Sequence, residues 1–125
     1  MIIVENNSLL NNKVLLVGIN TGNDELFNYE MTEMSNLCIA MGLEVIDNIT
    51  QNLANPVPAT YLGTGKLDEV KRYAGALEAD YIVFNDELSP VQFKNITNYI
   101  DIPVFDRTML ILEIFKTRAK TKEAV

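Results

Sequence analysis

The sequence predicts a small α/β domain with a mostly parallel four-stranded sheet and helices on both of its faces, followed by the start of a long helix. Four short apolar runs, bounded by polar or turn-forming residues, alternate with four amphipathic segments of helical length. A chain of 125 residues with 48% hydrophobic content is long enough for one core and too short for a second full domain. We expect the alternating strands to pair in parallel through right-handed crossovers.

The first half of the chain predicts two strands that flank a helix. The apolar run KVLLVGIN at 13–20 is typical of a buried strand. Apolar residues then recur every three or four positions over 23–41, with acidic residues in the first turn, and Gly42 is a typical helix end. LEVIDNIT at 43–50 predicts a second strand, and the two prolines of 52–60 predict a loop.

The second half repeats the alternation of helices and strands. One apolar face predicts a helix over 66–79, and DYIVFND predicts a strand over 80–86. A helix is expected over 89–100 and a fourth strand over 102–106. The remaining segment, 107–124, predicts the final helix.

The charge of the chain is unevenly distributed. The net charge is −7, with five basic and 15 acidic side chains in residues 1–106 but five basic and two acidic side chains in 107–125. Nucleic-acid binding needs clustered lysine and arginine, so only the basic end of the chain suits it. No apolar run approaches a membrane span and no export signal is visible, so we expect a cytoplasmic protein without a membrane span.

The reactive residue types give little support for catalysis. Cys38 is the one cysteine and lies among apolar helical neighbours, which predicts a buried, reduced thiol. The sequence has no histidine, no Asp-x-Asp pair and no Gly-x-Ser-x-Gly elbow, so no catalytic set and no metal site are predicted. An independent enzyme is therefore the weakest of the functional alternatives.

The stretch YLGTGKLDEV at 61–70 resembles a phosphate-binding loop, with Gly63, Gly65 and Lys66 close together. A Walker A loop needs a glycine where Thr60 stands and a hydroxyl residue where Leu67 stands, so a mononucleotide loop is not predicted. A tight turn into a helix explains the glycines, and an anion site at that helix start is the alternative.

The start of the helix over 89–100 is explained by initiation signals. Ser89 is a typical N-cap, Pro90 suits the first helical position and Gln92 completes a capping box. Leu88 and Phe93 have the spacing of a hydrophobic staple. Lys94 and Asn95 are left without such a role.

Polar side chains follow several of the predicted strands. In a parallel sheet they would meet at the carboxyl edge, where open α/β sheets bind ligands. These residues are Asn20, Thr21, Asn85, Asp86, Glu87, Asp106 and Arg107. Asp106 is also a candidate cap of the last helix, which leaves Arg107 as an ion-pair partner, a surface charge, or a contact to another domain or RNA.

Three runs, TYLGTGKLDEVK, FNDELSPVQFKN and VFDRTMLILEIFKTRAKTKEA, occur in this order over residues 57–124. Together they resemble the N-terminal domain of the HflX family of ribosome-associated GTPases. Before residue 57 the resemblance rests on topology alone. The family usually has glycine at the position of Met109, arginine at that of Lys94 and glutamate at that of Thr97.

The resemblance implies a fragment of a longer protein. Residues 1–106 would be the α/β N-terminal domain, and 107–125 the first helix of a truncated helical subdomain. The GTPase domain, with its GTP and magnesium, would lie beyond this fragment, which we expect to hold no cofactor and to be inactive as an enzyme by itself. The implied partners are the protein's own helical and GTPase domains and the large ribosomal subunit, which the family acts on in ribosome splitting or rescue under stress.

Two functional hypotheses follow from these residues. In the first, positive side chains of a ribosome-docking and regulatory domain contact RNA or another domain; the candidates are Lys66, Lys94, Arg107, Lys116, Arg118 and Lys120. In the alternative, a small-molecule or nucleotide-sensing module uses Gly63, Gly65, Lys66, Asn85 and Asp86. Apolar positions of the last helix are expected to favour self-association of the fragment.

Overall fold

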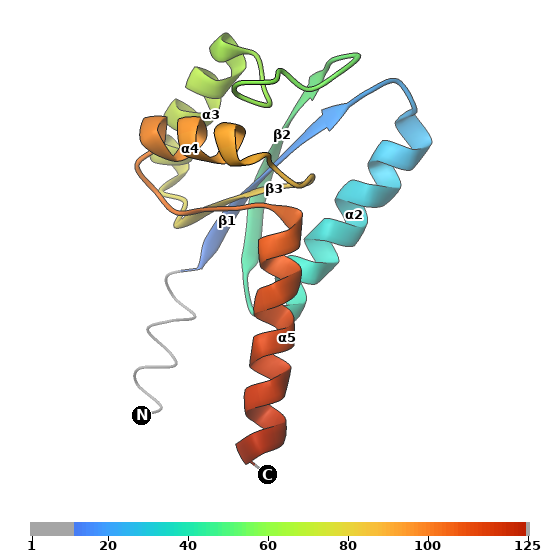
Figure 1. Ribbon diagram of the computed structural model, residues 1–125, viewed down its shortest axis with the longest axis vertical. Helices are drawn as coiled ribbons and strands as arrows, with labels where there is room; N and C mark the ends of the chain where they lie inside the picture. Colours follow the sequence, from blue (N-terminus) through green and yellow to red (C-terminus); the bar gives the residue numbers. More distant parts are fainter. Residues whose placement is uncertain (1–11, 125) are drawn as a thin grey trace.

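The computed structural model describes residues 12–124, with side chains up to residue 116. It contains a sheet of four parallel strands in the order β2-β1-β3-β4 (Figure 1). The strands are β1 (Lys13–Asn20), β2 (Glu44–Asn52), β3 (Tyr81–Phe84) and β4 (Val104–Phe105). The helices are α2 (Asp24–Ala40), α3 (Thr64–Leu77), α4 (Pro90–Tyr99) and α5 (Arg107–Ala124). The predicted α/β architecture is confirmed.

The strands of the second half are shorter than predicted. β3 ends at Phe84, although the N–H of Asn85 still donates to the carbonyl of Val17 at 2.8 Å. Asp80 lies outside β3, and its carboxylate accepts the backbone N–H of Lys13 at 2.8 Å. β4 is only two residues long and follows Pro103, which has no N–H to offer a longer ladder.

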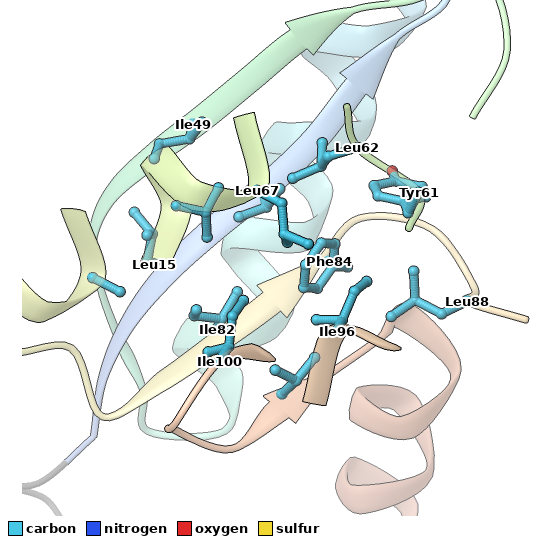
Figure 2. Close-up of a cluster of buried hydrophobic side chains, with 14 of the residues drawn as sticks. Leu15, Ile49, Tyr61, Leu62, Leu67, Ile82, Phe84, Leu88, Ile96 and Ile100 are labelled. Atoms are coloured by element: carbon cyan, nitrogen blue, oxygen red, sulfur yellow. The ribbon is translucent and has the colours of Figure 1, made fainter. Parts of the chain in front are cut away.

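Helices cover both faces of the sheet, as predicted (Figure 1). α3 and α4 pack on the face that presents Leu15, Ile82 and Phe84, in the larger hydrophobic cluster (Figure 2). α2 and α5 pack on the opposite face, where the buried side chains are Val14, Leu16, Met34, Cys38, Val83 and Leu110. Each core strand thus contributes alternate residues to the two faces.

The helix boundaries follow the expected signals closely. The Asn23 side chain caps α2 by accepting the N–H of Leu26 at 3.0 Å, and the turn after the helix contains Gly42 at φ 82°. The capping box of Ser89 and Gln92 at the start of α4 is confirmed. Within the described residues, none of the helices combines the length and apolar character needed to cross a bilayer.

Candidate functional site

The strand order reverses between β1 and β3. The chain moves from β1 to β2 on one side and then returns to place β3 on the other side of β1. β1 pairs with β2 as far as Asn20, whereas its pairing with β3 stops at Val17. In doubly wound sheets the crevice at such a switch point, outside the carboxyl ends of the strands, is the usual ligand site.

Tyr61 fills the region beyond the end of β3. Its side chain is 1% exposed, its ring meets that of Phe84 edge-on at 5.4 Å between centroids, and its hydroxyl donates to the carboxylate of Asp86. Burial first, and then the Asp86 carboxylate, raise the pKa of Tyr61, so the phenol stays neutral. The chain's own side chain therefore closes this part of the crevice.

The backbone at Tyr61 is strained. Its φ is 66°, and the N–H of Leu62 donates to the carbonyl of Thr60 at 2.6 Å, which together form the rare γ-turn with a positive central φ. An antiparallel bridge between Val57 and Tyr61 holds the turn. No sequence signal predicted this conformation, because positive φ is expected of Gly63 and not of an aromatic residue.

The glycine-turn candidates already have internal partners. The N–H of Gly63 donates to Oε1 of Gln51 at 3.0 Å, and Nζ of Lys66 lies 3.2 Å from Oε1 of Glu69. Gly65 is exposed, and a side chain at its position would meet no atom within 4 Å. These contacts support a structural turn, and anion binding by the three residues stays a prediction.

Asn85 is a buried polar residue without a partner. It is 1% exposed, and neither atom of its side-chain amide has a hydrogen-bond partner among the described residues. The alternation of Ile82, Val83 and Phe84 between the two hydrophobic clusters places Asn85 on the α2/α5 side of the sheet. Lys66 belongs to α3 on the other side, so the ligand-binding candidates do not lie around one point.

The basic candidates are distributed over three helices. Lys94 is exposed on α4, and Lys116 is exposed on α5 with its Nζ 3.6 Å from Oε1 of Glu113. The guanidinium of Arg107 lies 2.7 Å from Oε1 of Glu33 on α2. α5 continues through Arg118 and Lys120, whose side chains lie outside the described residues. Contacts of the six basic residues with RNA or another domain stay a prediction.

Asp106 joins two parts of the carboxyl edge. Its side chain is buried and accepts the N–H of Met109 at 2.8 Å, which confirms it as the cap of α5. The other carboxylate oxygen accepts the N–H of Leu88 at 3.0 Å, in the loop between β3 and α4. This second bond was not foreseen, and it fixes the start of α5 to the loop that carries Asp86.

Two further tyrosines bind carboxylates at the edges of α3. Tyr73 donates to Asp47 of β2, and Tyr99 of α4 donates to Asp68 of α3. These hydrogen bonds are the main cause that lowers the pKa of each aspartate and raises the pKa of each tyrosine. They link neighbouring elements and form no common pocket.

Burial raises the pKa of the Cys38 thiol to about 11, so it is protonated at neutral pH. Among the side chains that the structure describes, no group of three or more potential ligands could hold a metal ion. Fold and site together therefore define a small doubly wound α/β module whose switch-point region is closed by Tyr61.

Comparison with known proteins identifies the family. The model of the family described as GTP-binding GTPase N-terminal matches residues 28–116. The chain belongs to this family, and it corresponds to the N-terminal domain of an HflX GTPase.

The relatives carry the name GTPase HflX, and this chain matches a part of each. GTPase HflX of Lacrimispora saccharolytica is 41% identical over 111 residues, which are 89% of this chain and 26% of the relative. GTPase HflX of Flavobacterium psychrophilum is 42% identical over 90% of this chain and 28% of its own length. The chain thus spans about a quarter of these relatives.

A solved structure supports the fold. The crystal structure of SsGBP in complex with GDP superposes with a TM-score of 0.66, covering 85% of this chain and 29% of that chain. At 21% sequence identity, this similarity concerns the fold alone.

Proposed function

We propose that this chain is the ribosome-docking and regulatory domain of an HflX-type GTPase that acts on the large ribosomal subunit. The family match over residues 28–116 supports its place in such a GTPase. The observation that carries the docking role is the position of α5, which extends from the α/β domain beyond the other helices and leads into the basic end of the chain (Figure 1).

Charge makes α5 the RNA-contacting element in this proposal. The four basic residues after Arg107 lie between 116 and 122, within a single helix. A helix that neutralises a few phosphates releases counterions, so binding should weaken as salt is raised. The acidic α/β domain contributes little to such binding and would orient α5 instead.

The attachment of α5 supports the regulatory part of the proposal. Asp106 fixes the first turn of α5 to the loop after β3, and Leu110 is buried beneath the helix. Arg107 adds an ion pair to Glu33 of α2. α5 would therefore move together with the α/β domain, which lets the position of the domain on the ribosome act on the rest of the GTPase. GTP, magnesium, and ribosome splitting or rescue under stress belong to the whole protein in this proposal.

The filled crevice favours docking over ligand sensing. A sensing module needs an open site for its ligand, whereas Tyr61 occupies this region and hydrogen-bonds Asp86, one of the sensing candidates. The docking function needs only the surface of α5 and a rigid domain behind it.

Co-sedimentation with purified large ribosomal subunits over a salt series tests the proposal. We expect pelleting at low salt that is lost when Lys116, Arg118 and Lys120 are changed to Glu. A control variant changes Lys13, Lys71 and Arg72 to Glu, which gives the same net charge away from α5. Equal loss in both variants, or no pelleting of the unchanged chain at low salt, would contradict docking through α5.

A further inference from the structure

One segment of the chain, which includes α2, is strictly acidic, and the basic residues on the same side of the sheet belong to α5. Between residues 14 and 65 the sequence contains no lysine or arginine, and its six charged residues are Asp24, Glu25, Glu30, Glu33, Glu44 and Asp47. Four of these residues belong to α2. The basic residues of the α/β domain other than Lys13 lie on α3 and α4. α2 therefore presents a negative surface on the side of the sheet opposite to those helices.

The outer face of α2 also exposes two large apolar side chains. Leu26 is 52% exposed and Tyr29 is 65% exposed, three positions apart on the helix. Glu25, Glu30 and Glu33 lie beside them at helical spacing, so these five residues share one face, called here the α2 face. Apolar anchors within a polar rim are the usual composition of a protein-docking surface.

The α2 face already binds one guanidinium. Oε1 of Glu33 lies 2.7 Å from the guanidinium of Arg107, at the end of the face nearest to α5. Glu25 and Glu30 have no ion-pair partner among the described side chains. Two carboxylates thus remain beside Leu26 and Tyr29, with the spacing to receive further cationic side chains.

We propose that the α2 face docks a lysine- and arginine-rich segment of a ribosomal protein of the large subunit. This inference rests on the proposed function, and it adds the orientation of the domain. Phosphates repel this acidic surface, so RNA is the unsuitable partner. Ribosomal proteins combine positive charge with apolar side chains, which match the carboxylates and the two anchors. α5 would then face RNA while the α2 face meets protein.

Reversing the charge of the α2 face should change the binding affinity in opposite directions for a basic protein and for RNA. Changing Glu25 and Glu30 to Lys is expected to weaken binding to large subunits about tenfold or more if the partner is a basic protein. The same change would strengthen binding if the face approached phosphates. Tighter or unchanged binding therefore overturns the inference.

The apolar anchors give a second, charge-neutral test. The variant Leu26→Ser with Tyr29→Ser should also weaken binding about tenfold or more, because anchors at the centre of an interface carry most of its affinity. Ile39→Ser is the matched control, since Ile39 is 60% exposed on the same helix but outside the α2 face. Circular dichroism of each variant checks that α2 remains folded. Equal effects of the serine pair and the control contradict the inference.

Photo-crosslinking identifies the partner directly. p-Benzoylphenylalanine replaces Tyr29 in one sample and Ile39 in another, and each is irradiated with purified large subunits. We expect position 29 to crosslink to a ribosomal protein, identified by mass spectrometry, and position 39 not to. Crosslinks from position 29 to ribosomal RNA, or none while the chain pellets, overturn the inference alone. Absence of pelleting overturns the proposed function and this inference with it.

Discussion

The two faces of the sheet are packed very differently. On the α3/α4 face, aliphatic side chains from both helices surround Phe84 and the strained Tyr61 in one continuous cluster (Figure 2). On the α2/α5 face the buried set is smaller and includes Met34 and Cys38. Grooves open on both faces, so they do not distinguish them. On the second face they measure about 250 Å³ beside Leu110 and about 420 Å³ between α2 and β2, and beside α3 on the first face they measure about 310 Å³ and about 330 Å³.

The difference in packing suggests that one face mainly stabilises the fold and that the other is available for binding partners. A large, continuous cluster of aliphatic side chains fixes the positions of its elements, whereas methionine adapts to irregular space at lower specificity. Both faces contain one edge-on aromatic pair, so the aromatic contacts do not separate them. Gly18 on the second face is another place where a methionine fills the space. A Cβ at Gly18 would lie 2.8 Å from Sδ of Met31, which is the flexible part of that side chain. We infer that the α3/α4 face holds the fold and that the α2/α5 face retains surface for partners.

The largest expected effect compares one core residue from each face. Phe84→Ala should lower the free energy of unfolding by about 3–5 kcal/mol, because it leaves a cavity and removes the ring beside Tyr61. Met34→Ala, equally buried on the other face, should cost about 2–3 kcal/mol, since neighbouring methionines can move into the space.

Urea unfolding of both variants measures these costs, with equal m-values as the check on two-state behaviour. A larger loss for Met34→Ala than for Phe84→Ala would show that the α2/α5 face holds the fold, and would reverse the comparison.

The next effect concerns the connection between the faces. Asp106→Ala should destabilise by about 2 kcal/mol, because it removes the cap of α5 and leaves the N–H of Leu88 without its acceptor. Asp106→Asn keeps one side-chain oxygen and should cost about half as much. Thermal unfolding compares the two variants, and equal costs would mean that the charge of Asp106 matters more than its geometry.

Much of the fold was predictable because local signals agree with the tertiary structure. The buried strand at Lys13–Asn20, the amphipathic helix at Asp24–Ala40 and the capping box of Ser89 and Gln92 each follow from residue types at fixed spacing. The cap at Asp106 was predicted in the same way. These features depend on neighbours in sequence, which a single sequence displays.

The candidate site was less predictable because it depends on contacts between distant segments. Tyr61 meets Asp86, 25 positions away, through a backbone conformation that aromatic residues rarely adopt. Asp80 meets Lys13, 67 positions away: its carboxylate accepts the N–H of Lys13, and its own N–H donates to the carbonyl of Lys13. Spacing along the chain contains no information on either contact. The sequence therefore drew attention to the glycine turn and did not predict the role of Tyr61 in closing the crevice.

Removing the N-cap of one helix on each face compares the two faces through a smaller loss of stability. Ser89→Ala removes half of the capping box of α4 and should cost about 1 kcal/mol. Asn23→Ala removes the single side-chain cap bond of α2 and should cost about 0.5 kcal/mol. Amide hydrogen exchange in the first turn of each helix locates the effect. A larger cost for Asn23→Ala would make α2 the better-anchored helix and contradict the proposed division of roles.

The smallest effect concerns the ion pair of Arg107 and Glu33, which connects α5 to α2. The Arg107 side chain is 29% exposed and the Glu33 side chain 43% exposed, so solvent screens the pair. A double-mutant cycle with Arg107→Ala and Glu33→Ala should therefore give a coupling energy of about 0.2–1 kcal/mol, which falls in high salt. A coupling near the upper value would make Arg107 a structural residue of the α2/α5 face. A coupling near zero would leave its guanidinium available to exchange Glu33 for a phosphate, as expected of a residue that contacts RNA.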